Sequence, residues 1–506
     1  MSHDDGTTAA GGGFSRRTAL KTAGLASALA TLELVGRGTK VPVRLEAATP
    51  NVALPDIQFD IGNFIAPAQT QENGVVARFG PQNTTFLTAQ LTRPPTKTDQ
   101  QNLTAAMSAL EFNYPFAAGG IMTFISYGIP YFNRLPERLT GPLVSSHMPR
   151  LASNSNRFVL EEAVPGPTDV SPNNPTISKL TYNVPVLIEN NEILITIRGD
   201  DSSFVADVVR WFGGSNSLSG RRVASPVPGL FHFTSSRAMF QAMGLPRYVA
   251  GANNLPFAPF IHPNSPMWMG FADQQVDGSG PAAITTFVGN SSAKVTTAMP
   301  GDYFDNGSIQ HLSHDILDMN QWFALDANGN PGDDGTFLEH VQYMFRANPP
   351  PSMGNADQFY NGGGPSFLDN KFQGTNDALN SARGIGTLPD PTTGQPQRRM
   401  GHLSTLQRSS RAADGTPMHI RMDGAGFDSM DVPNGSNQPK LQFTAFVPSA
   451  DFFTTMRSNA ASLDLQNRFA IDQSDNGLER FITATRRQNF LCPPRRHRAF
   501  PLLELT

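Results

Sequence analysis

The amino-acid sequence predicts an α+β protein. A strand-like run, Ile193–Ile197, passes through a short polar turn into a helical pattern at residues 202–212, whose apolar residues recur on one face. Much later, residues 441–447 alternate apolar and polar side chains as a strand does, and a helical pattern follows from Ala450 to about Ala461. Strand followed by amphipathic helix, found twice, favours stacked layers of sheet and helix.

Length and composition limit the possible classes of protein. A chain of 506 residues exceeds one ordinary hydrophobic core, so two domains with extensions are expected. With 39% hydrophobic residues, 16% charged residues, 45 Gly and 41 Pro, the chain is a loop-rich globular protein. The net charge of −4 and the scattered basic residues offer no surface for nucleic acid. Cys492 is the only cysteine, which excludes an intrachain disulfide, a multi-cysteine zinc site and an iron–sulfur cluster built from this chain alone.

Residues 1–48 have the layout of an export signal. The motif Ser15-Arg16-Arg17-Thr18-Ala19-Leu20-Lys21 precedes a moderately apolar run, Thr22–Val35, as in twin-arginine signals. This run is too short and too interrupted for a stable membrane span. The sequence therefore predicts export to the periplasm or the cell exterior, with cleavage near residues 45–48.

The remaining chain divides into three predicted parts. Residues 49–114 are rich in Pro, Thr, Gln and Asn and are interpreted as an extension wrapped on the core. Residues 115–255 form a first half, which contains the strand-like run at 121–127. Residues 256–506 form a second half, interrupted by a turn-rich insertion at 323–400. A short helix is expected from His314 to Trp322.

Two segments far apart in the chain supply side chains that suit a haem peroxidase. They are Gly270-Phe271-Ala272-Asp273 and the run from Gly401-His402 through Asp414-Gly415-Thr416 to Arg421. One neutral imidazole can hold a ferric haem and leave the opposite face of the iron open to peroxide. That face needs an acid–base group for the peroxide proton and a permanent cation to stabilise negative charge. His402, Asp273 and Arg421 fit these three roles.

The order of carboxylate, histidine and arginine, with Arg421 nineteen residues after His402, resembles the dye-decolourising peroxidase family. In that family Gly-x-x-Asp opens the distal side of the haem, and a downstream His binds iron from the proximal side. The resemblance spans roughly residues 115–500. It implies two ferredoxin-like halves with antiparallel sheets and peripheral helices, haem b held by the second half, and hydrogen peroxide and a reducing dye or phenolic compound as partners.

The sequence departs from the family pattern directly after Asp273. The usual Gly-x-x-Asp-Gly is replaced by a motif that ends in Gln274, and a bulky side chain stands where glycine lets the backbone approach the haem. Asp277, four residues further on, is the alternative distal carboxylate.

Three further residues are assigned to the cofactor. His419 and Asp423 lie two residues before and after Arg421, so on a strand all three would share one face. His419 is a rival iron ligand or a neighbour in the distal pocket. His314 falls near the position where the resemblance implies a contact with a haem propionate, and with His311 it could form a metal pair or share a helix face.

Three functions are compatible with this pattern. The first is a haem peroxidase that uses hydrogen peroxide to oxidise dyes, phenolics or related reductants. The second is a non-peroxidase protein that binds haem or a porphyrin through a degenerate distal site. The third is a haem-free descendant of the family. Cys492 precedes Pro493-Pro494, as in the family's C-terminal segment, and is expected to be buried or at a strand edge instead of ligating iron.

Overall fold

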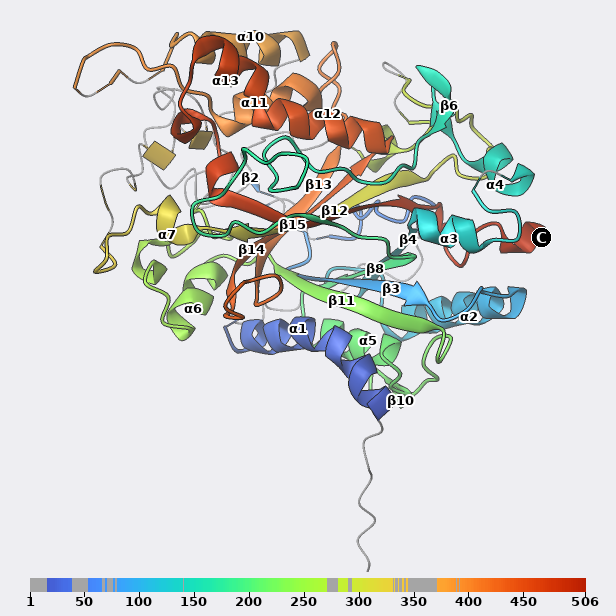
Figure 1. The fold of residues 1–506 in the computed structure, drawn as a ribbon. Coiled ribbons are helices and arrows are strands. Elements are labelled where there is room, and N and C mark those ends of the chain that lie inside the picture. Colours follow the sequence, from blue (N-terminus) through green and yellow to red (C-terminus); the bar gives the residue numbers. More distant parts are fainter. Residues whose placement is uncertain are drawn as a thin grey trace, which may run out of the picture.

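Eight antiparallel strands form a ring of two four-stranded sheets, and helices cover the outer face of each sheet (Figure 1). The computed structural model describes residues 16–38, 53–65, 69–70, 76–77, 80–139, 141–270, 281–289, 294–330, 332, 335, 339–340, 343–344, 371–387, 389–390 and 392–506. None of the helices within these ranges has both the length and the apolar character needed to cross a bilayer.

The first half has the chain order strand, helix, strand, strand, helix, strand. Its elements are β3 (Asn83–Leu91), α2 (Lys97–Asn113), β4 (Met122–Tyr127), β8 (Ile193–Gly199), α5 (Ser202–Phe212) and β11 (Phe231–Phe240). In the sheet the strands run in the order β11-β3-β8-β4, and all neighbours are antiparallel. This connectivity and strand order define a ferredoxin-like unit.

The second half repeats the same arrangement. Its main elements are β12 (Ser308–Leu317), α10 (Lys371–Ala382), α11 (His402–Ser410), β13 (Ile420–Asp428), β14 (Gln438–Val447), α12 (Ala450–Ala461) and β15 (Ile482–Cys492). The sheet order β15-β12-β14-β13 is the ferredoxin-like order again. Single residue pairs close the ring at both junctions, Phe240 with Ala425 and Tyr127 with Leu491. The predicted fold class, α+β with two ferredoxin-like halves, is therefore confirmed.

Local sequence signals account for several of these elements. The helix predicted at 202–212 is α5, and the Asp201 side chain caps it by accepting a hydrogen bond from the Ser203 N–H. Its apolar residues Val205, Val208 and Val209 are buried. The helix predicted from Ala450 is α12, which Ser449 caps in the same way. These helices begin where a polar side chain can satisfy backbone N–H groups that have no partner inside the helix.

The expected N-terminal extension is wrong for residues 83–113. They supply β3 and α2, the first strand and first helix of the first half. β3 lies between β11 and β8, so strands far along the chain pair with both of its edges. Its composition, Asn-Thr-Thr-Phe-Leu-Thr-Ala-Gln-Leu, is polar enough to suggest a loop. Pairing on both edges nevertheless buries nearly all of it.

The short helix predicted from His314 to Trp322 is also wrong at its start. Residues up to Leu317 belong to β12, and only Met319–Trp322 form a helix, α7. Every residue of β12 is buried, because the interior of the ring covers one face and helices cover the other. Such a strand loses the polar and apolar alternation that identifies strands in a sequence. His311 and His314 therefore share no helix face.

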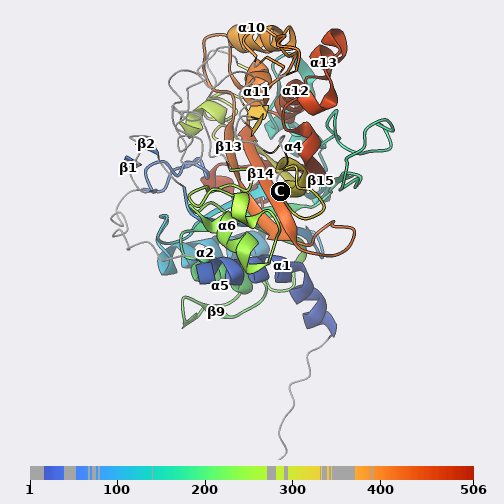
Figure 2. The same ribbon diagram turned by 90° about the vertical axis from the view of Figure 1, so that its left-hand side faces the viewer.

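The apolar run assigned to the export signal lies in a helix packed on the first half. α1 (Arg16–Gly38) crosses β11 and lies beside α5 (Figures 1 and 2). Leu25, Ala28, Leu32 and Val35 are buried along one face. The Thr31 hydroxyl donates a hydrogen bond of 2.8 Å to the Phe427 carbonyl. This helix thus covers apolar surface of the folded protein.

Shorter elements complete the structure. The helices are α3 (Ile129–Arg134), α4 (Pro142–His147), α6 (Leu245–Ala252) and α13 (Leu463–Phe469), and the short strands are β1 (Gln69–Thr70), β2 (Val76–Ala77), β5 (Arg150–Leu151), β6 (Asn154–Phe158), β7 (Leu187–Ile188), β9 (Ser217–Leu218) and β10 (Arg221–Arg222). Single turns of 3-10 helix include η5 (Glu479–Phe481), directly before β15.

Candidate functional site

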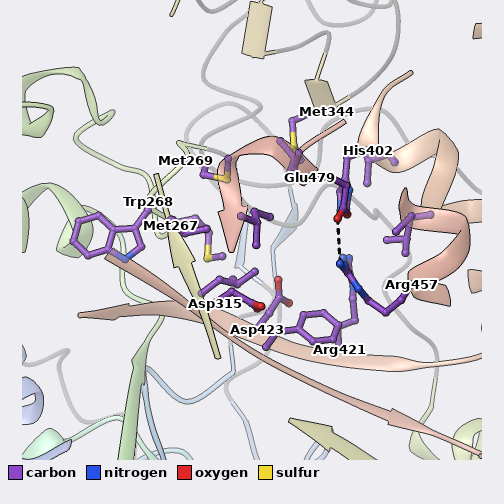
Figure 3. A pocket seen from close by; sticks show the side chains of 18 of the residues that line it. Met267, Trp268, Met269, Asp315, Met344, His402, Arg421, Asp423, Arg457 and Glu479 are labelled. Atoms are coloured by element: carbon purple, nitrogen blue, oxygen red, sulfur yellow. Dashed lines mark hydrogen bonds and ion pairs between the residues drawn. The ribbon is translucent and has the colours of Figure 1, made fainter. Parts of the chain in front are cut away.

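A cavity lies between the sheet of the second half and the helices α11 and α12 that cover it (Figure 3). The centre of a water molecule can occupy about 180 Å³ of it. Its lining from the sheet is Asp315, Leu317, Arg421, Asp423, Leu441, Phe443, Ile482 and Arg487. Its lining from the helices and η5 is His402, Leu403, Leu406, Met456, Arg457, Ala460, Leu478 and Glu479, and Gln241, Met267, Trp268, Met269 and Met344 close the side.

A β-bulge determines which side chains of the sheet reach this cavity. Between β12 and β15, Asp315 pairs with Ala484 while His314 pairs with Arg486, so Thr485 is an extra residue on β15. The bulge shifts the alternation of β15 by one residue. Ile482 before it and Arg487 after it can therefore line the same cavity.

His402 is the first residue of α11 and lines the cavity from the helix side. Burial lowers the pKa of its imidazole to about 4, with Arg421 and Arg457 adding to the effect and Glu479 opposing it. The ring is therefore neutral at neutral pH. Its Nδ1 has no hydrogen-bond partner among the described residues. A neutral imidazole whose buried Nδ1 is unpaired is suited to ligate a metal.

Glu479 lies on the His402 side of the cavity and is held by cations. Burial opposes its ionisation, but Arg457 and Lys179 outweigh this and keep its pKa below the usual value. Arg457 Nη2 lies 3.1 Å from Glu479 Oε2, and Thr168 donates a hydrogen bond to the same carboxylate (Figure 3). The helix side of the cavity thus combines a neutral imidazole with an ionised carboxylate.

Arg421 and Asp423 face the cavity from β13. They are two residues apart on one strand, so their side chains share a face, as the sequence pattern suggested. The structure thus brings His402, Arg421 and Asp423 around one cavity although His402 and Arg421 belong to different walls. A permanent guanidinium charge across from a neutral imidazole can stabilise an anion between the two walls.

Other predicted residues lie elsewhere. His314 lies on the opposite face of β12, away from the cavity, with Nδ1 2.8 Å from Thr485 Oγ1 and Nε2 3.3 Å from Asp428 Oδ1. Both of its ring nitrogens are thus engaged, which leaves none for a propionate or a metal. His419 is buried directly before β13 and does not line the cavity. Cys492 is buried at the end of β15, where burial raises the pKa of its thiol to about 12.

The two candidate distal carboxylates, Asp273 and Asp277, lie outside the described residues. The described chain before them ends at Gly270, which directly follows the cavity residues Met267, Trp268 and Met269.

Sequence reasoning missed four charged residues of the cavity: Asp315, Arg457, Glu479 and Arg487. One signal was available for Asp315, which stands alone as a carboxylate next to the apolar pair Ile316-Leu317. A lone carboxylate within a buried strand is rarely left without a role. Arg457 and Glu479 could not be found in this way, because each lies among polar neighbours typical of a solvated surface.

The residues around the cavity fit a haem. Leu403, Leu406, Leu441, Phe443 and Met456 offer apolar contacts for the faces of a porphyrin. His402 can supply one axial nitrogen. In the described part of the chain no group of three or more His, Cys, Asp or Glu is arranged to hold a bare metal ion. This donor set suits an iron whose other ligands come from the porphyrin.

Several solved structures resemble the chain. A DyP-type peroxidase from Cellulomonas bogoriensis has 13% sequence identity and a TM-score of 0.47, with 87% of this chain and 98% of that chain covered. The encapsulated DyP-type peroxidase from Mycobacterium smegmatis has 14% identity and a TM-score of 0.42, with 85% and 96% covered. A variant of DypB from Rhodococcus jostii, solved in complex with haem, has 13% identity and a TM-score of 0.43, with 83% and 95% covered.

The sequence itself matches one described family. A search of curated proteins finds no match. Residues 159–331 and 364–494, more than half of the chain, match the family described as "Family of unknown function (DUF7405)". These segments contain β8, β11 and β12 and every residue that lines the cavity except Met344. The chain belongs to this family, DUF7405.

Proposed function

We propose that the protein is a haem peroxidase of the dye-decolourising type, which reduces hydrogen peroxide and oxidises a dye, a phenolic compound or a related reductant. One observation carries the proposal: the neutral imidazole of His402 and the guanidinium of Arg421 line one cavity from opposite walls. Bound haem b would supply the redox chemistry that cleaves the O–O bond.

The protein's own residues have distinct roles in this proposal. His402 holds the iron from α11, and its low pKa keeps the imidazole unprotonated and available. Arg421 places a permanent positive charge where a deprotonated peroxide oxygen carries negative charge. Asp273 is proposed to move the peroxide proton, with Asp277 as the alternative.

Bulky reductants need not enter the cavity. Trp268 lines it, and its indole Nε1 donates a hydrogen bond of 2.9 Å to the Gly426 carbonyl. We propose that Trp268 can pass electrons between the cavity and the surface. Among the three tryptophans of the chain, Trp211 and Trp322 do not line the cavity.

A second candidate function is haem or porphyrin binding without peroxide cleavage. Gln274 favours it, because this side chain replaces the glycine of the distal motif. Export through the twin-arginine route is a further proposal, supported by the motif Ser15–Lys21. The N-terminal sequence of the protein recovered outside the cytoplasm would test it.

An absorption spectrum tests the main proposal. The purified protein, supplied with haem during expression, is expected to show a Soret band that changes within seconds after one equivalent of hydrogen peroxide and returns when a dye is added. A Soret band without response to peroxide favours the second candidate. A protein that takes up no haem contradicts both.

A further inference from the structure

Asp315 differs from other buried carboxylates that belong to the second half or contact it. It is 5% exposed and lines the cavity from β12, with its carboxyl group directed into the space (Figure 3). Among the described residues it makes no hydrogen bond and no ion pair. By contrast, Asp169 forms two hydrogen bonds with Arg487, Glu479 pairs with Arg457, and Asp428 pairs with His314 and Lys440.

The strand arrangement explains why Asp315 has no partner. Its neighbours in register are Leu441 on β14 and Ala484 on β15, and neither side chain can bind a carboxylate. The bulge at Thr485 lies directly beside it, and bulges often redirect side chains next to functional sites. An unpaired buried carboxyl group costs stability, so its retention calls for another reason.

The charged groups around Asp315 are used by other residues. Arg487 donates to Asp169 and to Ser313, and Arg457 binds Glu479. Burial has the largest effect and raises the pKa of Asp315 to about 6. The two cations oppose this rise, and the carboxylates of Asp169 and Glu479 add to it. Arg421 and Asp423 on β13 line the same cavity. Asp315 can therefore exchange a proton near neutral pH.

The position of Asp315 relates it to the candidate iron ligand. His402 belongs to the helix wall of the cavity, and Asp315 belongs to the sheet wall together with Arg421. A group that His402 would hold from the helix wall would have the sheet wall, with Asp315 and Arg421, opposite His402.

We propose that Asp315 is a proton-exchanging catalytic residue of the sheet wall, which acts on hydrogen peroxide directly or through one water molecule. This inference rests on the proposed peroxidase function. Asp315 takes the proton from one peroxide oxygen and returns it to the other, which leaves as water when the O–O bond breaks. The carboxylate ends in its starting state, and the two electrons come from the bound iron porphyrin. The proposal gives the protein a second acid–base group besides the proposed Asp273.

The experiment compares haem-loaded wild-type protein with Asp315→Asn, Asp315→Glu and Asp318→Asn. Asp318 is a buried aspartate three residues further on, outside the cavity, where it caps α7, and asparagine can also cap a helix. Stopped-flow mixing gives the rate of the reaction with peroxide from pH 4 to pH 8. Titration of the resting absorption spectrum over the same range, without peroxide, reports ionisation beside the iron independently of turnover.

We expect Asp315→Asn to slow the peroxide reaction by about 100-fold or more, the usual contribution of a positioned acid–base group. The inflection near pH 6 should disappear from the resting spectrum of this variant, while Asp315→Glu restores part of the rate and Asp318→Asn behaves as wild type. If Asp315→Asn reacts at the wild-type rate with the wild-type pH profile, or if only Asp273→Asn is impaired, the role of Asp315 is wrong and the peroxidase proposal stands. If wild-type protein binds no haem or ignores peroxide, both proposals fail.

Discussion

His402 and Arg421 line one cavity from opposite walls, the first from helix α11 and the second from strand β13. They also interact electrostatically, because the charge of Arg421 helps burial to lower the pKa of His402. The pair therefore keeps the imidazole neutral and places a cation across from it.

His402→Ala should abolish stable haem binding. Loss of the residue that accepts a hydrogen bond from a ligating histidine already weakens metal binding by roughly 10–100-fold, so loss of the ligand should exceed about 100-fold. Titration of the purified protein with haem, followed by the Soret band, measures the affinity. His419→Ala is the control, since His419 is a second histidine with a lowered pKa that does not line the cavity. Haem binding that depends on His419 and not on His402 would contradict the assignment.

Arg421→Leu should retain haem but react slowly with peroxide. Removing one preorganised group that stabilises developing charge typically costs about 10²–10³-fold in rate. Stopped-flow absorption spectroscopy measures the reaction, and an unchanged Soret band shows that the site is intact. Arg421→Lys keeps a positive charge and should recover part of the rate. Equal rates for wild-type protein and Arg421→Leu would remove Arg421 from the proposed mechanism.

Asp273→Asn should reduce the rate of the peroxide reaction more than Asp277→Asn. Of these two carboxylates, the one that lies next to the bound peroxide can carry its proton, and the Gly-x-x-Asp spacing assigns this role to Asp273. Stopped-flow rates of the peroxide reaction, measured for both variants over a range of pH, show which carboxylate is required. A loss confined to Asp277→Asn would show that the motif is shifted by four residues.

Asp315→Asn should stabilise the haem-free protein above pH 6. Burial raises the pKa of this carboxyl group from 3.8 to about 6 in the folded state, so the folded state binds more protons than the unfolded state between these values. Stability therefore falls as the pH rises through this window, by about 3 kcal/mol in total. The Asp315→Asn variant lacks this penalty. Its free energy of unfolding should therefore equal that of wild type at pH 3 to 4 and exceed it by the full amount at pH 7.

Urea denaturation at a series of pH values measures this gain, and Asp318→Asn again controls for the loss of a buried aspartate. If Asp315→Asn is more stable than wild type but reacts more slowly with peroxide, Asp315 is retained for function at the expense of stability. No gain at pH 7 would mean that Asp315 has a partner in solution.

Leu32→Ala should destabilise the protein by about 2–5 kcal/mol, the usual cost of truncating a buried leucine. Leu32 is 2% exposed on the face of α1 that packs against β11 and α5. Glu33→Ala is the control on the same helix, because Glu33 forms only an exposed ion pair with Arg37. Equal stability of both variants would show that α1 contributes nothing to the fold and is free to act as a removable signal.

The sequence by itself determined the local units and much of the candidate site. Helices α5 and α12 were predicted because capping residues and apolar periodicity are encoded within a few residues. The two-residue spacing of Arg421 and Asp423 was enough to place both side chains on one strand face.

Only the tertiary structure decided which segments and faces meet. β3 is a central strand because β8 and β11 pair with it from more than 100 residues away. His314 and Asp315 are neighbours in sequence, yet opposite faces of β12 separate them, and the bulge at Thr485 adjusts β15 to the same cavity. Which face of a sheet is covered depends on packing between segments far apart in the chain. A shift of one residue in register moves every side chain of a strand to the opposite face, so local sequence patterns cannot specify which side chains line the cavity.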